Sequence, residues 1–362
     1  MSLNLATASD VPVAANASCR TADAIGAAGY FPPGAEFFGL PPFARPRLYV
    51  MSSPSGWTRW RLTASYPAHR PSARAARTAI RGLHALGLHA RVRRARGPWL
   101  ISGFFPSIAS RVTYVSVLTS SLEGRFILEL HDGLGRIVGY LKHAQTEQGM
   151  RRLEREYQTL RMLPSGLAPE PLRFGPLGNG LALLTSPIHG RPMHPILPPP
   201  SFVVEYLSQL TVPNKRQEAC DYWPRLEDAG LRECIRTLSG TTWPVAIEHG
   251  DFAPWNVFRT GPARVVAIDW EHSETKGFPY LDSAHYLLQT AALVKRLRPA
   301  AGLRQAIRVL TGIGGARLGI DRAAAICRLS AYNAHRRSAA DSVAPSDPLQ
   351  IWRRQLWQGG NG

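Results

Sequence analysis

Apolar and polar residues alternate in three runs between residues 111 and 144. The runs read RVTYVSVL (111–118), RFILELH (125–131) and IVGYLKHA (137–144), and such alternation is typical of strands with one buried face. The last two runs are separated by Asp-Gly-Leu-Gly at 132–135, a composition that favours a tight hairpin turn. The pattern predicts an antiparallel sheet.

After this sheet the apolar spacing becomes helical. One helix is predicted to end at Pro164 and Gly166, with an apolar face made of Met150, Leu153, Tyr157, Leu160 and Leu163. Two strand patterns follow at 172–174 and 181–185, and then a proline-rich crossing at 186–200. Beyond Ser201 the chain is mostly helical, apart from a strand-loop-strand segment at 245–270. These elements predict an α+β fold.

The N-terminal part of the chain, residues 1–100, differs from the rest in composition and in apolar spacing. Residues 1–44 are rich in Ala, Gly and Pro without a sustained period, so a flexible lead segment is expected. Residues 45–100 are expected to form a basic extension of small α/β type, with a strand at 47–50 and a helix at 72–86. Along that helix an apolar stripe (Ala76, Ile80, Leu83, Leu86) is expected to be buried, with three arginines (Arg74, Arg77, Arg81) facing water.

Charge and composition restrict the classes of function and of partner that fit this chain. The chain has 362 residues with a formal net charge of +18, and no Asp or Glu occurs between Phe37 and Leu122. The electrostatic field of a strongly positive chain attracts anionic partners. Nucleic acid is nevertheless an unlikely partner, since no helix-turn-helix, zinc-finger or ribonucleoprotein pattern is present. No apolar run is long enough to span a membrane and no leader pattern opens the chain, so a cytoplasmic location is expected. The oligomeric state is left open.

The segment 245–271, VAIEHGDFAPWNVFRTGPARVVAIDWE, carries the chemistry. A short strand beginning at Asn256, a turn at 260–262 and a returning strand at 264–268 would form a hairpin. Asn256 and Asp269 are then neighbours in space, and Asp251 lies on the loop just before them. Carboxylate and amide oxygens suit Mg²⁺, which completes its shell with water and nucleotide phosphates. A further carboxylate can accept a proton from an attacking hydroxyl.

HGDFAPWN at 249–256, followed by IDWE at 268–271, resembles the catalytic loop and metal-binding segment of the aminoglycoside phosphotransferase and choline kinase family. The resemblance implies a protein-kinase-like two-lobe fold, with an N-lobe at 101–190 that contains the sheet and a mostly helical C-lobe at 191–362. It implies ATP and Mg²⁺ as cofactors. Asp251 would orient or deprotonate a substrate hydroxyl, His249 would brace the loop, and Asn256 and Asp269 would hold the metal. Asp282 would tie the loops together.

A second set of residues would grip the nucleotide. Lys142 ends a predicted strand, and Glu156 falls on the apolar side of the next helix, where a carboxylate is costly unless paired. The resemblance implies that these two form the pair that positions the phosphates. It also implies a phosphate loop at Ser120 and Ser121, which is poor in glycine, and a hinge that receives adenine around Thr185, Ser186 and Ile188.

Three functions remain open at this point. The leading hypothesis is transfer of the γ-phosphate of ATP to a hydroxyl of a small molecule. The glycine-poor phosphate loop also allows a catalytically weak or silent nucleotide-binding scaffold, and the charge alone would allow nucleic-acid binding. The acceptor pocket is placed between Ser201 and Trp243. Because acids and bases are interleaved there, a neutral or anionic acceptor, such as a sugar or a glycan or lipid precursor, is expected in preference to a polycation.

Overall fold

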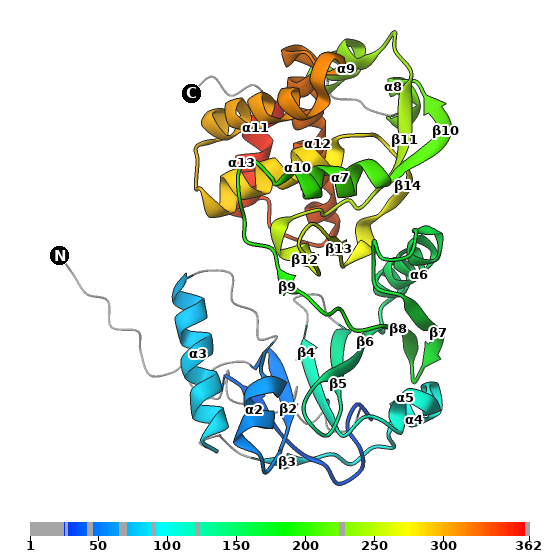
Figure 1. The fold of residues 1–362 in the computed structure, drawn as a ribbon, viewed down its shortest axis with the longest axis vertical. Helices are drawn as coiled ribbons and strands as arrows, with labels where there is room; N and C mark the ends of the chain where they lie inside the picture. Colours follow the sequence, from blue (N-terminus) through cyan, green and yellow to red (C-terminus); the bar gives the residue numbers. More distant parts are fainter. Residues whose placement is uncertain are drawn as a thin grey trace, which may run out of the picture. The chain divides into compact units, whose positions relative to one another are not determined.

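The structure is a computed structural model that describes residues 25, 28–41, 46–64, 71–87, 92–119, 124–223 and 229–358. The chain divides into two compact units. The sheet unit consists of the described residues of Met1–Leu153 and Pro171–Pro187, and the helical unit of those of Glu154–Glu170 and Ile188–Gly362. Each is considered by itself. The chain segments can be followed by colour in Figure 1.

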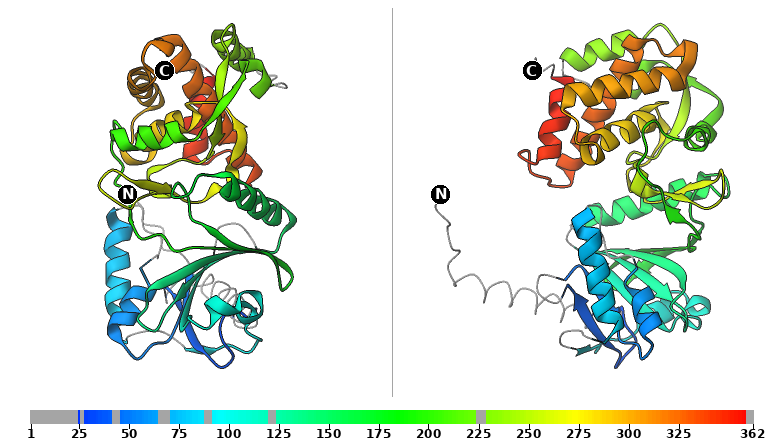
Figure 2. Two further views of the ribbon diagram at one scale, coloured as in Figure 1. Left: turned by 45° about the vertical axis from the view of Figure 1, so that its right-hand side comes forward. Right: turned by 60° about the vertical axis from the view of Figure 1, so that its left-hand side comes forward.

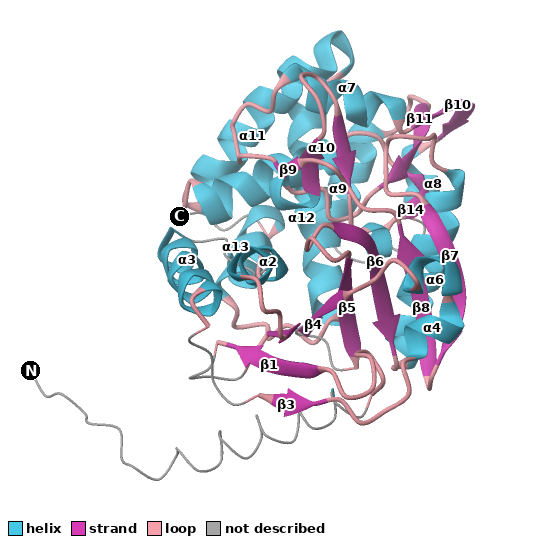
Figure 3. Cartoon of the chain, turned by 60° about the horizontal axis from the view of Figure 1, so that its bottom comes forward, coloured by secondary structure: helices cyan, strands magenta, loops and turns pink. Residues whose placement is uncertain are grey.

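The sheet unit is built on eight strands in the spatial order β3-β1-β2-β4-β5-β6-β8-β7, all paired antiparallel. Figure 3 shows β3 and β1 at one end of the sheet and β7 at the other. In chain order the strands are β1 (Glu36–Leu40), β2 (Leu48–Met51), β3 (Arg93–Arg94), β4 (Tyr114–Thr119), β5 (Arg125–His131), β6 (Ile137–Ala144), β7 (Pro171–Leu177) and β8 (Gly180–Thr185).

The predicted hairpin is confirmed as β5 and β6, with the predicted bounds. Asp132 closes its turn, since its Oδ1 accepts the backbone N–H groups of Leu134 at 2.9 Å and Arg136 at 2.8 Å. Gly135 has φ +70°, a conformation that glycine adopts without strain. The hairpin fixes the register of the strand that carries Lys142, which pairs with Ile127 on one side and Leu183 on the other.

The N-terminal extension differs from its prediction. Residues 45–100 do not form a separate domain, because β1, β2 and β3 continue the sheet beyond β4. Part of the predicted lead segment belongs to the core as well: Tyr30, Phe31 and Phe37 are fully buried. Residues 1–24 lie outside the described residues. Short helices accompany these strands, namely α2 (Gly56–Leu62), α3 (Pro71–Ala85), α4 (Leu100–Phe104) and α5 (Pro106–Ala109).

The buried face predicted for α3 is confirmed only at Ile80, which is partly buried against the core. Leu83 and Leu86, expected in the core, are 43% and 75% exposed. His84 is buried instead and packs on Phe38 with 4.5 Å between ring centroids. Arg81 faces α2, where its guanidinium lies 4.0 Å from the Trp60 ring and donates to the Trp60 carbonyl at 2.9 Å. Arginine can cover an aromatic face and satisfy a carbonyl at once, which spacing alone does not reveal.

The helical unit packs its helices around α12, which contacts α9, α10, α11 and α13. Figure 2 shows α11, α12 and α13, in orange to red, lying together in this unit. Small buried residues line α12, including Ala323, Cys327 and Ala331, and they allow the neighbouring helices to approach closely. The helices are the end of α6 (Glu147–Met162), α7 (Ser201–Gln209), α8 (Ala219–Tyr222), α9 (Ala229–Leu238), α10 (Leu281–Gln289), α11 (Pro299–Gly314), α12 (Ile320–Ala340) and α13 (Pro348–Trp357).

Two three-stranded sheets complete the helical unit. One has the order β10-β11-β14, with β10 (Thr211–Gln217), β11 (Trp243–Glu248) and β14 (Glu274–Gly277), and the other has the order β13-β12-β9, with β9 (Arg191–Pro192), β12 (Val257–Arg259) and β13 (Val265–Ala267). Strand β10 was expected to be helical, and its sequence TVPNKRQ gave no sign of the pairing with β11 that holds it. The α+β class, with one sheet-based and one mostly helical part, is confirmed.

Among the described residues, no helix combines the length and apolar character needed to cross a bilayer.

Candidate active site

The loop that carries Asp251 follows strand β11 directly. Gly250 turns the chain with φ +83°, and a Cβ atom there would lie 2.2 Å from the carbonyl oxygen of His272. No side chain fits at that distance, so glycine is required by both conformation and space. The turn brings Asp251 out of the strand.

Asp282, at the start of α10, fastens this loop. Its two carboxylate oxygens accept the backbone N–H groups of His249 at 2.6 Å and Gly250 at 3.0 Å. Burial, together with the neighbouring charge of Glu248, raises the pKa of Asp282 to about 7, although the two N–H donors work against this. The tying role expected of Asp282 has a direct geometric basis.

Asp282 is expected to make folding stability fall as the pH rises toward neutrality. An unfolded aspartate loses its proton near pH 3.9, whereas Asp282 in the folded protein keeps it until about pH 7. Between these values the native state holds the extra proton, so its stability relative to the Asp282→Asn protein should decrease by up to about 1.4 kcal/mol per pH unit. Urea unfolding of both proteins from about pH 4.5 to 8 measures this difference. A difference that grows with pH would contradict the raised pKa.

The carboxylate of Asp251 is held from two sides. Its Oδ2 accepts the side-chain N–H of Asn256 at 3.0 Å, and its Oδ1 accepts the Nε2–H of His285 at 3.0 Å. Burial is the largest single influence and works to raise the pKa of Asp251, but the hydrogen bond from His285, together with the further electrostatic influence of His285 and His249, outweighs it, and the pKa lies below its ordinary value. The side chain remains 37% exposed. Asp251 is therefore an ionised, oriented and accessible carboxylate.

His285 was not predicted from the sequence. It lies on α10, one helical turn after Asp282, and its side chain is only 4% exposed. Burial lowers the pKa of His285 below its ordinary value, although the Asp251 carboxylate works in the opposite direction. A neutral imidazole has one N–H, and the short contact to Asp251 places it on Nε2. A histidine in the sequence LDSAHYLL gave no signal beyond its i, i+3 spacing from Asp282.

We expect His285→Leu to lower kcat about 10-fold to 100-fold with little change in the KM for ATP. The Asp251 carboxylate would lose the donor that fixes its orientation, while the nucleotide contacts would be untouched. His285→Gln should keep most of the wild-type kcat, because the Gln amide can donate to the Asp251 carboxylate from nearly the same position. Equal losses in both variants, with lowered thermal stability, would mean that His285 only fills space.

His249 braces the loop from inside. Its Nε2–H donates to the carbonyl of Ile268 at 2.8 Å, and its Nδ1 accepts the backbone N–H of Asp251 at 3.2 Å. The ring lies against Phe252 and Trp270. Burial lowers the pKa of His249 to about 4, so the imidazole is neutral at ordinary pH. The side chain is fully buried, and it connects the Asp251 loop to the hairpin that follows.

The predicted hairpin forms from β12 and β13, with Val257 paired to Ala267. The backbone N–H of Ile268 donates to the carbonyl of Asn256 at 2.9 Å, so Asp269 follows directly after the residue paired with Asn256. Asp269 itself has φ +68°, a left-handed conformation that Asp and Asn adopt more readily than other residues. The two predicted metal ligands are brought together as the spacing implied.

These two residues fit Mg²⁺ bound to a nucleotide. The side-chain nitrogen of Asn256 donates to the backbone carbonyl of Asp251 at 2.9 Å and to the Asp251 carboxylate at 3.0 Å. The amide oxygen of Asn256 is therefore left for a cation. Within the described ranges no three His, Cys, Asp or Glu side chains gather as a metal cluster. One carboxylate and one amide oxygen are a small set, of the kind that Mg²⁺ supplements with water and phosphate oxygens.

The remaining predicted residues are divided between the two units. Glu156 is 3% exposed in the helical unit, on the apolar side of α6 as predicted, and its Oε1 accepts the backbone N–H of Trp270 at 3.4 Å. Ile188 also belongs to the helical unit. Lys142 on β6, Thr185 at the end of β8, and Ser186 belong to the sheet unit, so the pairing of Lys142 with Glu156 stays a prediction. Ser120 and Ser121 lie outside the described residues.

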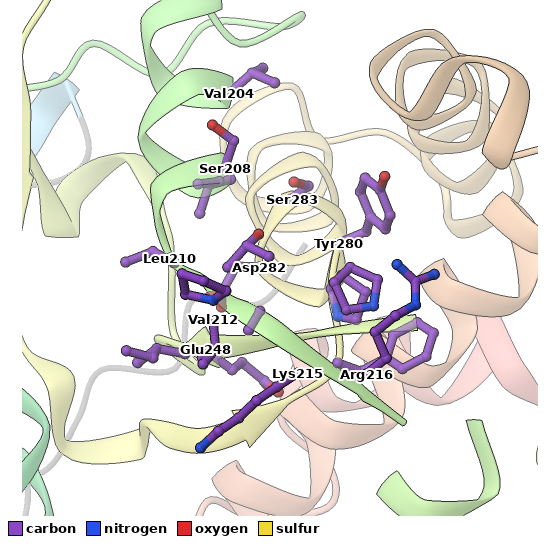
Figure 4. Close-up of a pocket in the computed structure, with 18 of the residues that line it drawn as sticks. Val204, Ser208, Leu210, Val212, Lys215, Arg216, Glu248, Tyr280, Asp282 and Ser283 are labelled. Atoms are coloured by element: carbon purple, nitrogen blue, oxygen red, sulfur yellow. The ribbon is translucent and has the colours of Figure 1, made fainter. Parts of the chain in front are cut away.

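A cavity of about 520 Å³ lies beside this site in the helical unit. Figure 4 shows Ser208 of α7, Lys215 and Arg216 of β10, and Asp282 and Ser283 of α10 around it. It takes part of its lining from the stretch where the acceptor pocket was expected, and the rest from β11, from the start of α10 with the residues just before it, and from Ile313 and Arg317. Asp282 connects the cavity to the Asp251 loop, because it lines the cavity and also accepts the backbone N–H groups of His249 and Gly250 in the loop.

Comparison with known proteins gives structural similarities only. No protein-family model matches the chain, and no curated protein matches it in sequence. Among solved structures, a macrolide 2'-phosphotransferase type I aligns over 69% of this chain and 94% of its own, with 17% identity and a TM-score of 0.44. An ethanolamine kinase from Plasmodium vivax aligns over 68% and 81%, with 13% identity and a TM-score of 0.44.

A choline kinase from Cryptosporidium parvum Iowa II aligns over 69% of this chain and 88% of its own, with 12% identity and a TM-score of 0.43. At these identities and TM-scores, no activity or substrate can be carried over. In each case the matched structure is a phosphotransferase or kinase that is named for a small molecule.

Proposed function

We propose that the protein transfers the γ-phosphate of ATP to a hydroxyl group of a small molecule. The observation that carries the proposal is the Asp251 carboxylate, which is fixed by His285 and Asn256, ionised, and still 37% exposed. A carboxylate with this environment can accept the proton of an attacking hydroxyl. Its partner Asn256 and the adjacent Asp269 supply oxygen ligands suited to Mg²⁺ on the phosphates.

Each residue has a distinct part in the proposed reaction. The Asp251 carboxylate orients the acceptor hydroxyl and takes its proton as the oxygen attacks phosphorus and ADP leaves. Asn256 and Asp269 hold Mg²⁺, which, when bound, offsets negative charge on the phosphates. Asp282 and His249 keep the loop in place through the backbone of residues 249–251. Lys142 and Glu156 are proposed to position the nucleotide phosphates, and Thr185, Ser186 and Ile188 to receive the adenine.

The acceptor is proposed to be neutral or anionic and to enter through the cavity beside Asp282. About 520 Å³ is enough for a molecule of sugar or sugar-phosphate size. Two carboxylates and three cationic side chains line the cavity, namely Glu248, Asp282, Lys215, Arg216 and Arg317. Both carboxylates are already engaged, Glu248 by Arg337 and Asp282 by two backbone N–H groups. Little negative charge is left to attract a polycation.

ADP release with a panel of acceptors tests this proposal. Neutral sugars, sugar phosphates, choline and an aminoglycoside should be compared at low and at physiological salt, in the presence of ATP and Mg²⁺. Turnover with a neutral or anionic acceptor, absent in the Asp251→Asn protein, is expected. If the aminoglycoside gives a higher kcat/KM than all of the neutral and anionic acceptors, the charge reasoning is wrong. If no acceptor gives turnover while ATP still binds, the scaffold function is favoured instead.

A further inference from the structure

A second cavity, of about 420 Å³, lies in the helical unit between α6, β14 and α12. Its lining does not include Asp251, Asn256 or Asp269. Arg155 comes from α6, Lys276 from β14, and Arg336 and Arg337 from α12, with the aromatic side chains of Tyr222 and Trp223 beside them. Four cationic side chains from three separate elements thus line one concave space.

Half of this positive charge is not compensated by the carboxylates that line the cavity. Two carboxylates line the cavity, Glu248 and Glu274. Glu248 is paired with Arg337, whose Nη1 lies 3.3 Å from its Oε1. In the described part of the chain, no carboxylate forms an ion pair with Arg155, Lys276 or Arg336, and Arg336 has only a cation–π contact, 5.7 Å from the Tyr332 ring. Like charges placed together repel one another, so an anion between them would lower their energy.

The shape and chemistry restrict the kind of anion. The cavity has room for a small molecule but is too small for a nucleic-acid duplex. Guanidinium groups match the oxygens of a tetrahedral phosphate through paired hydrogen bonds, and a lysine adds a mobile point charge. We propose that this cavity is a second binding site that takes the phosphate group of a small molecule, apart from the site at Asp251.

Such a ligand would contact the support of the Asp251 loop. Arg337 would face both the bound phosphate and Glu248, which ends β11 immediately before His249. Burial raises the pKa of Glu248 while Arg337 works to lower it, so the charge of Glu248 depends on this arginine. The backbone of the cavity wall also contacts the loop, because the carbonyl oxygen of His272 lies 2.2 Å from the position that a Cβ atom of Gly250 would take. A phosphate bound in the cavity would therefore change the surroundings of Glu248, the residue that precedes the Asp251 loop.

Binding of inorganic phosphate to the full chain, without nucleotide, tests the proposal. Calorimetry should be carried out at matched ionic strength with chloride as the reference anion. We expect saturable binding in the wild type and an affinity at least about tenfold weaker when Arg155, Lys276 and Arg336 are all replaced by Ala. A matched control replaces Arg298, Arg304 and Arg308 by Ala; these arginines are exposed at the start of α11 and along it, and they do not line the cavity. That control should bind as the wild type does.

The Asp269→Asn protein, titrated with phosphate in the presence of Mg²⁺, separates this cavity from the proposed metal site, and it should bind phosphate normally. Unchanged affinity in the triple variant would overturn the second site. Equal weakening in the α11 control would show that only the general positive field acts, and loss of phosphate binding in the Asp269→Asn protein would place the phosphate at the metal site. None of these readouts requires turnover, so failure of the proposed transferase activity would leave the result interpretable.

Discussion

Asp251→Asn should abolish most phosphoryl transfer while the protein folds and binds ATP normally. The amide has nearly the same shape as the carboxylate, and its oxygen can keep the hydrogen bond from His285 or the one from Asn256, but it cannot accept the proton of the acceptor hydroxyl. We expect kcat to fall on the order of 10²-fold or more, with an unchanged affinity for ATP. Single-turnover assays and calorimetry measure the two quantities separately.

The control for this variant is Asp321→Asn, which makes the same chemical change in the exposed first turn of α12. It should have normal activity. Near-normal turnover of the Asp251→Asn protein would remove Asp251 from the catalytic role. A lower melting temperature for Asp251→Asn than for the control would instead indicate that the Asp251 carboxylate supports the fold.

Replacing Asp269 should abolish Mg²⁺-dependent binding of ATP. The residue supplies the one carboxylate of the proposed metal site, so its loss leaves the Asn256 amide oxygen alone. The choice of variant matters because Asp269 has φ +68°. Asn tolerates this conformation nearly as well as Asp, whereas Ala adds backbone strain of about 1 kcal/mol. Asp269→Asn therefore isolates the charge, and Asp269→Ala tests charge and backbone together.

Calorimetric titration of ATP with and without Mg²⁺ measures the effect. Asn256→Ala should weaken binding less than either Asp269 variant, because it removes a neutral ligand, although it also removes the amide that holds Asp251. Unchanged Mg²⁺-dependent affinity in the Asp269→Asn protein would mean that the IDWE segment is structural. Loss of binding in the Ala variant alone would identify the backbone strain as the cause.

The centre of the site could be predicted because it depends on local spacing. Asn256 and Asp269 are neighbours through one short hairpin, and a turn at 260–262 was enough to bring them together. The partner that orients Asp251 could not be found in this way. His285 lies 34 residues further along the chain, on a helix whose position depends on packing around α12. Spacing in the sequence carries no information on such a contact.

The same distinction separates the correct and incorrect elements. Strands β5 and β6 were predicted with their bounds because alternation and a tight turn both act within a few residues. Strand β10 is held by pairing with β11, about thirty residues away, and its own sequence favours no strand. In α3, an interaction of Arg81 with Trp60 decided the buried face, against the apolar spacing. The two cavities depend on several elements at once and had no local signal.

The eight-stranded sheet also determines where the chain can be shortened. The described residues before Arg111 do not form an appendage, because β2 pairs with β4 along its length and buries Leu48, Tyr49 and Val50. A chain that began near Arg111 would leave the backbone donors and acceptors of β4 without their neighbour and would uncover apolar side chains beside them. Unprotected strand edges of this kind pair with other molecules and aggregate. The N-terminal strands thus serve the solubility of the sheet unit.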